Sequence, residues 1–133
     1  MIGIDSNVLM RVVLGDDKIW SARAEKLIAA KCTSAQPGYI NTIVLAEAFW
    51  VLRRRPDFDK QKLVEFVRGL LDSEIFVVAD ERTVLLALKD YVSGNAGFAD
   101  YLIARLNEAA GASPTYTIDK VAARNPIFQP VPY

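Results

Sequence analysis

Short apolar segments, each followed soon after by a helix, restrict what this chain can fold into. Residues 1–4 and 75–79 read as buried strands, residues 39–40 as a brief extended segment and residues 115–118 as a further strand, and amphipathic segments lie between them. Strands that alternate with helices predict a largely parallel sheet covered by helices on both faces. Residues 127–133 are expected as an edge strand, because their prolines would interrupt the hydrogen bonds of a central strand. We therefore expect an α/β fold with a sheet of about four to five strands.

Three of the predicted helices carry expectations about burial. The segment IVLAEAFWVLRRR is apolar almost all round, which predicts a mostly buried helix with Glu47 in its middle. A helix over about residues 18–30 is expected to place its apolar side chains mostly on one face, and a helix over about residues 98–110 is expected to end at Gly111. The side chains in question are Ile19, Ala22, Leu27 and Ala30 in the first of these, and Leu102, Ile103 and Leu106 in the second.

Composition bounds the class of protein. A chain of 133 residues that is 52% hydrophobic fits one domain over residues 1–133 with a sizeable core. The balance of 16 basic and 16 acidic residues gives no overall field, so nucleic-acid binding would need a local patch or bound cations. Neither a signal sequence nor an apolar run of the ~20 residues that span a bilayer is seen, so we expect a cytoplasmic protein without a membrane segment.

The sequence contains no histidine and a single cysteine, Cys32. Serine triads with an imidazole base, Cys-His pairs and histidine-ligated zinc or iron are therefore excluded. A multi-cysteine zinc site and an internal disulfide are excluded as well. An enzyme built on this chain would depend on carboxylates, hydroxyls, lysine, or a hard metal ion held by oxygen atoms.

Four acidic residues stand at positions that suit such chemistry. Asp5 and Asp119 directly follow the apolar segments MIGI and TYTI, so the fold would place both at the carboxyl edge of the sheet, where ligands bind in α/β proteins. Glu47 is surrounded by apolar neighbours, and Asp100 stands in the first turn of its helix. Each acid alone also fits a structural role, as a helix cap, an exposed acid or a partner for the helix dipole.

Taken together, the four carboxylates would repel one another if they converged at one edge of the sheet. Proton sharing or a divalent cation would relieve that repulsion. A set of oxygen ligands without histidine is typical of Mg²⁺ or Mn²⁺. The sequence therefore predicts a metal site suited to phosphate chemistry.

Over nearly its whole length the chain resembles the PIN-domain ribonucleases, and especially the VapC-type toxins of toxin-antitoxin pairs. IDSNVLMR is similar to the opening motif of that family and TIVLAEAFWVLRR to its central glutamate helix. GFADYLIARL is similar to its third acidic motif, and TIDK to its closing Thr/Ser-x-Asp motif. The motifs occur in the family's order, at a matching spacing and in a chain of matching length.

This resemblance implies a three-layer α/β/α sandwich and metal-assisted hydrolysis of RNA phosphodiester bonds. Asp5, Glu47, Asp100 and Asp119 would form the acidic quartet. Asp5 and Asp100 are the best candidates for direct metal ligands, Asp119 would bind only through water, and Glu47 would bind directly or act from behind the ligands. The resemblance also implies a cognate antitoxin protein and a homodimer as partners.

Further residues are candidates for supporting roles. Asn7 and Thr117 flank the strand-end acids and would hydrogen-bond a carboxylate or a metal-bound water, or simply make local turn and cap bonds. Arg54, two helical turns beyond Glu47, and Arg11, within two turns of Asp5, are candidates for contact with RNA or antitoxin. One departure from the family concerns Asn95, since relatives often carry another acid in this loop; the number of metal ions, one or two, stays open.

Two other functions remain open at this stage. A catalytically weak PIN-like module that only binds a partner would retain the fold without the hydrolysis. A phosphatase with Asp5 as nucleophile would normally need a second aspartate two residues later, where Asn7 stands.

Overall fold

The computed structural model describes residues 1–132 and divides the chain into two compact units. The first unit is Met1–Ala79, and the second begins at Asp80 and takes in the rest of the described chain. None of the helices within residues 1–132 has the length and apolar character needed to cross a membrane.

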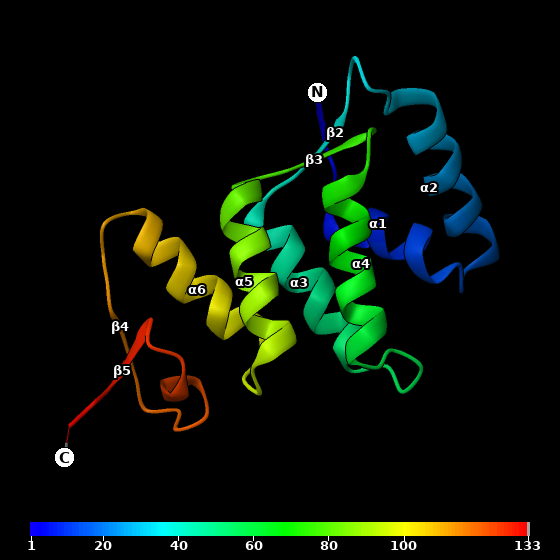
Figure 1. Ribbon diagram of the computed structural model, residues 1–133. Coiled ribbons are helices and arrows are strands. Elements are labelled where there is room, and N and C mark those ends of the chain that lie inside the picture. Colours follow the sequence, from blue (N-terminus) through cyan, green and yellow to red (C-terminus); the bar gives the residue numbers. More distant parts are fainter. Residues whose placement is uncertain (133) are drawn as a thin grey trace. The chain divides into compact units, whose positions relative to one another are not determined.

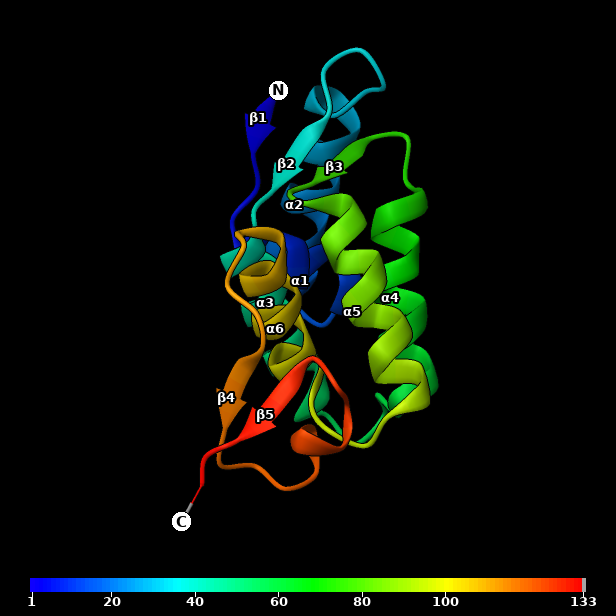
Figure 2. The same cartoon turned by 60° about the vertical axis from the view of Figure 1, so that its left-hand side comes forward.

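A three-stranded parallel sheet forms the centre of the first unit. Its strands are β1 (Ile2–Gly3), β2 (Gly38–Ile40) and β3 (Phe76–Val78), in the order β1-β2-β3, and Figure 2 shows them side by side. Ile2 pairs with Gly38, and Tyr39 pairs with Val77. Two helices connect each strand to the next, as a parallel pair requires.

The first connection consists of α1 (Ser6–Leu14) and α2 (Lys18–Lys31), which pack against each other (Figure 1). Gly15 ends α1 with a φ of 60°, a backbone conformation that glycine adopts at little cost. The Asp17 carboxylate accepts hydrogen bonds from Ile19 N and Trp20 N at the start of α2. α2 thus begins and ends close to the predicted range of residues 18–30.

The prediction for the buried face of α2 is wrong. Ser21, Ala24 and Ile28 are its buried residues, while Ile19 is 63% exposed and Ala22, Leu27 and Ala30 are also exposed. A serine can occupy the inner face because its Oγ accepts a hydrogen bond from Asp17 N. The helix is therefore turned so that part of its apolar surface faces outward.

The second connection consists of α3 (Thr42–Arg53) and α4 (Lys60–Asp72), capped by the side chains of Asn41 and Asp59. Contrary to the prediction of a mostly buried helix, α3 buries only one face, and Glu47 is exposed. The inner face of α3 carries Val44, Leu45, Ala48, Phe49 and Leu52, and Ile43 and Trp50 are exposed.

The second unit contains α5 (Glu81–Ser93) and α6 (Phe98–Ala109), which pack together, followed by β4 (Thr115–Thr117), the 3₁₀ helix η1 (Ala122–Arg124) and β5 (Phe128–Pro130). As predicted, Leu102 of α6 is buried and Gly111 follows the helix with a positive φ, whereas Ile103 is exposed and Leu106 only half-buried. The inner face of α6 carries Phe98, Tyr101, Leu102 and Ala104 instead.

The loop between α5 and α6 is closely fitted to Tyr101. Ala96 N donates a hydrogen bond to the buried Tyr101 hydroxyl at 3.2 Å. A Cβ atom at Gly94 would overlap that hydroxyl and would also come within 2.9 Å of the Asp90 carbonyl oxygen. The loop that leads into α6 therefore leaves no room for a side chain at residue 94.

The expected sheet of four to five strands is not formed. The central sheet has three strands, and β4 and β5 pair in parallel with each other in a sheet of their own (Figure 2). Thr115 N donates to Ile127 O and Val131 N donates to Thr117 O, so β4 satisfies its backbone groups with β5. Strands of two or three residues make few such bonds, and their own sequence does not determine which sheet they join. Tyr133, the end of the predicted edge strand, lies outside the described residues.

We predict that Gly38→Ala destabilises the protein by about 1–3 kcal/mol, because overpacking strains a close-packed core. A Cβ atom at Gly38 would lie 2.9 Å from Ile4 Cγ1, 3.0 Å from Cys32 Sγ and 3.1 Å from Phe76 Cδ1. Urea denaturation followed by circular dichroism would measure the loss.

Gly69→Ala is the matched control for Gly38→Ala. Gly69 lies in α4 and a Cβ there would meet no atom within 4 Å, so this change should stabilise the helix by about 0.5–1 kcal/mol. Equal stability of the two variants would show that the space around Gly38 is not restricted as described.

Candidate functional site

Asp5 stands between β1 and α1 and is exposed. Its backbone is extended, with φ −78° and ψ 155°, and its Oδ1 accepts a hydrogen bond from Ser6 N at 2.9 Å. The strand thus ends at an acid that caps the next helix with one carboxylate oxygen. Asn7 lies in the first turn of that helix and is also exposed.

Glu47 lies on the open face of α3. Positions 43, 47, 50 and 54 recur at the helical spacing, and all four side chains are exposed. Arg54 stacks on Trp50, with its Cζ 4.6 Å from the ring centroid, so its guanidinium lies over the residue one turn beyond Glu47. Within residues 1–132 the Glu47 side chain has neither a hydrogen bond nor an ion pair.

In the second unit, Asp100 lies in the first turn of α6, and Asp119 lies in the turn that leads into η1. Gly97 N donates to Asp100 Oδ2 at 3.1 Å, which fixes the half-buried carboxylate at the start of α6. Val121 N and Ala122 N donate to Asp119 Oδ1 at 2.8 and 3.1 Å, at the start of η1. Thr117 Oγ1 accepts from Asp119 N at 3.0 Å, so this predicted supporting residue makes the local bond expected of a turn.

The four predicted acids share one electrostatic property. None of them forms an ion pair within its own unit over residues 1–132, whereas other acids, Asp16 and Asp90 among them, do. Their charges are uncompensated by protein groups, and the carboxylate oxygens of Asp5 and Asp119 that do not cap a helix are free to accept a ligand. Uncompensated carboxylates without histidine are chemically fitted to a hard divalent cation.

The acids are distributed evenly between the units, Asp5 and Glu47 in the first and Asp100 and Asp119 in the second. Over the described residues, neither unit gathers three or more carboxylate or thiol groups into a cluster that could hold a metal ion.

A family model described as PIN domain matches residues 2–126, a range that includes all four acids. The chain belongs to the PIN domain family. PIN domains are generally metal-dependent nucleases. A comparison with curated proteins finds no match.

The other basic candidate of this PIN domain, Arg11, lies on α1 and is exposed. Its guanidinium is 3.5 Å from a carboxylate oxygen of Asp16 and 4.0 Å from one of Asp17. Exposed pairs at such distances contribute little to stability and are easily exchanged for another anion. Arg11 therefore remains available to a phosphate group.

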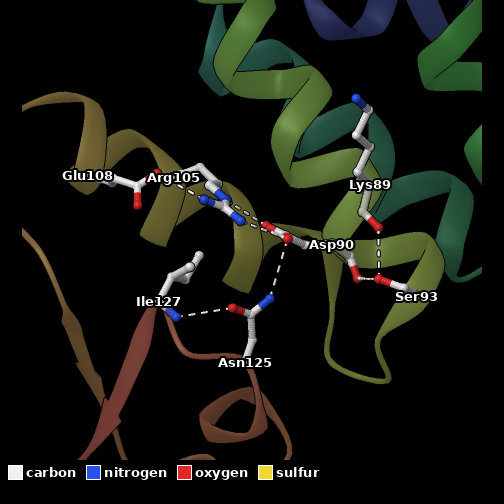
Figure 3. Close-up of polar contacts among 7 residues, drawn as sticks. All are labelled: Lys89, Asp90, Ser93, Arg105, Glu108, Asn125 and Ile127. Atoms are coloured by element: carbon white, nitrogen blue, oxygen red, sulfur yellow. Dashed lines mark hydrogen bonds and ion pairs between the residues drawn. The ribbon is translucent and has the colours of Figure 1, made fainter.

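A polar network that sequence reasoning missed joins three segments of the second unit (Figure 3). Arg105 of α6 donates to both carboxylate oxygens of Asp90 in α5, at 2.6 and 2.9 Å, and also to Glu108 at 2.9 Å. Asn125 Nδ2 donates to Asp90 at 3.3 Å, and Asn125 Oδ1 accepts from Ile127 N at 3.1 Å. The network ties the two helices to the segment that leads into β5.

These contacts also favour the charged form of Arg105. The hydrogen bonds to Asp90 raise the pKa of the Arg105 guanidinium above its ordinary value, and burial opposes them only in part. The Asp90 and Arg105 side chains are only 11% and 19% exposed, so the pair is well shielded from water. No local sequence pattern predicts this pair, because the partners are 15 residues apart.

We predict that Arg105→Met destabilises the protein by about 3 kcal/mol, because it leaves the Asp90 carboxylate unpaired in a largely buried position. Arg11→Met is the control, since it breaks only an exposed pair and should cost less than about 1 kcal/mol. Thermal and urea denaturation of both variants would measure the difference, and losses of similar size would contradict the structural role given to Arg105.

Proposed function

We propose that this protein is a metal-dependent ribonuclease in which both units form one PIN domain over residues 1–133, with the family's three-layer arrangement. Asp5, Glu47, Asp100 and Asp119 form its acidic site. The observation that carries the proposal concerns these four acids. They are the acids expected at the site of a family of metal-dependent nucleases, and they have no ion-pair partner in their own units.

Asp5 and Asp100 would hold the ion directly, Asp119 through water, and Glu47 directly or from behind the other ligands. Mg²⁺ or Mn²⁺ bound there would supply positive charge next to the phosphodiester and acidity to the attacking water. The chain has no histidine, so carboxylates are its own means of holding or moving a proton at the site.

The backbone contributes by orienting the acids. Ser6 N fixes Asp5, Gly97 N fixes Asp100, and Val121 N with Ala122 N fixes Asp119. A ligand that is already oriented loses little conformational entropy when it binds. Thr117 supports Asp119 by accepting from its backbone nitrogen, and Asn7 is the corresponding candidate beside Asp5.

RNA as substrate, and the role of a toxin, are proposed from the resemblance of four ordered motifs to the VapC-type toxins. A cognate antitoxin and a second copy of the chain would then be its protein partners. Arg11 and Arg54, both exposed, are proposed to contact RNA phosphates or the antitoxin.

We predict that Asp5→Asn and Asp100→Asn each lower RNA cleavage at least about 100-fold, the loss typical of removing one stabilising group from an active site. Asparagine still caps a helix, so the fold should be retained, or stabilised if repulsion between the acids is relieved. Cleavage of total RNA would be followed while Mg²⁺ or Mn²⁺ is titrated, with EDTA as the metal-free reference.

Asp72→Asn is the matched control, because Asp72 is an exposed acid at the end of α4 and has no ion pair within residues 1–132. Equal cutting by the Asp5 and Asp72 variants would identify a contaminating nuclease. Metal binding without cleavage of any RNA would favour the PIN-like binding module, and a trapped aspartyl-phosphate at Asp5 would favour the phosphatase.

A further inference from the structure

The first unit contains a hollow of about 500 Å³ between α1 and α2. Its volume falls within the roughly 300–1,000 Å³ typical of small-molecule sites. Here α2 turns Ser21, Ala24 and Ile28 inward. The larger side chains of Trp20 and Leu27 stay exposed. The lining residues are Asn7, Val8 and Arg11 from α1, and Trp20, Arg23, Ala24 and Leu27 from α2.

The polar groups of the hollow are mostly hydrogen-bond donors. Trp20 is 56% exposed, and Arg23 Cζ lies 5.0 Å from the centroid of its ring. Arg23 has no ion pair in the part of the chain that the structure describes, and Arg11 has only its long, exposed contacts with Asp16 and Asp17. The hollow is thus lined both by residues that carry hydrogen-bond donors, Asn7, Trp20 and two arginines, and by the apolar Val8, Ala24 and Leu27.

The hollow adjoins the proposed active site along α1. Asn7 and Arg11 are four residues apart and so lie on the same side of the helix. Asn7 lies in the first turn, and that turn is the one capped by Asp5. The hollow therefore begins within one helical turn of a proposed metal ligand.

We propose that this hollow binds a nucleobase of single-stranded RNA next to the cleaved bond, with the base against Trp20 and the neighbouring phosphates on Arg11 and Arg23. An aromatic surface flanked by guanidinium groups is what single-stranded nucleic acid needs, since every base offers a π face and every linkage a negative charge. This inference rests on the proposed function, because it assigns part of the substrate to the same site.

A segment of a partner protein is the competing occupant. Such a segment could bind in a purely apolar groove. This hollow, however, is also lined by several residues that carry hydrogen-bond donors, and neither Asp16 nor Asp17 lines it. An anionic ligand with an aromatic ring satisfies both the donors and the apolar walls. RNA meets these demands with each nucleotide, and the position beside Asp5 favours it further.

The test measures binding separately from cleavage. A short, fluorescently labelled single-stranded RNA of mixed sequence would be titrated with the full chain in EDTA, where no metal-dependent cutting occurs. Trp20→Ala should weaken binding roughly 5- to 100-fold, the loss that follows removal of one stacking surface. The same strand with abasic residues should bind the wild-type protein and Trp20→Ala equally.

Salt dependence tests the arginines. Arg23→Ala should reduce the slope of log K against log salt by about 0.7, the value of one phosphate contact on a single strand. Arg68→Ala is the matched control, because Arg68 is an exposed arginine of α4 that does not line the hollow, and the slope should not change.

The fluorescence of Trp20 itself identifies the occupant. Trp50→Phe leaves Trp20 as the single tryptophan, since the chain has two. Its emission should change when RNA is added. A response to an acidic, leucine-containing peptide but not to RNA would overturn the RNA assignment.

Two outcomes separate the subsite from the proposed function. Unchanged RNA binding by Trp20→Ala, together with intact metal-dependent cleavage by the wild-type protein, would overturn the subsite and leave the nuclease standing. Binding that depends on Trp20 without any metal-dependent cleavage would support the subsite as an RNA contact and overturn the nuclease.

Discussion

The unsatisfied N–H groups at the starts of helices are the constraint on which much of this molecule depends. Every helix exposes backbone donors at its first turn, and here aspartates and one asparagine accept hydrogen bonds from some of them at the starts of α1, α2, α3 and α4. A capping carboxylate has two oxygens, and Asp5 and Asp119 each use only one of them. The same side chain can therefore begin a helix and still present an oriented oxygen to a ligand.

This dual use explains why the acids carry so little other bonding. An acid paired with arginine, such as Asp90, has its charge already compensated and is poorly suited to hold a cation. Asp5, Asp100 and Asp119 of the proposed site are held by neutral backbone groups instead, which orient them without removing their charge. Orientation and charge compensation are thus separate properties of an acid, and each is visible in its hydrogen-bond partners.

Local signals in the sequence predicted the elements well, because caps, glycines and apolar periodicity act within a few residues. Asp17, Asn41 and Asp59 cap helices by accepting from backbone nitrogens three residues later, and Gly15 ends a helix. Properties that depend on distant residues were predicted poorly. The inner face of α2 includes a serine whose hydroxyl is satisfied by a neighbour, α3 exposes part of its apolar surface, and β4 pairs with β5 rather than joining the larger sheet. Sequence motifs identified the four acids of the proposed site. The network of Asp90, Arg105 and Asn125 was not predicted, because its partners are far apart in the sequence.

The fit between Gly94 and Tyr101 has a consequence for how relatives of this chain can vary. The φ of −112° at Gly94 is one that any residue adopts, so the restriction comes from the space that the phenol ring and its hydroxyl occupy. A larger residue at 94 would require a shorter one at 101, and that exchange would also remove the acceptor for Ala96 N. The two positions should therefore covary across the family, with glycine at 94 wherever tyrosine stands at 101.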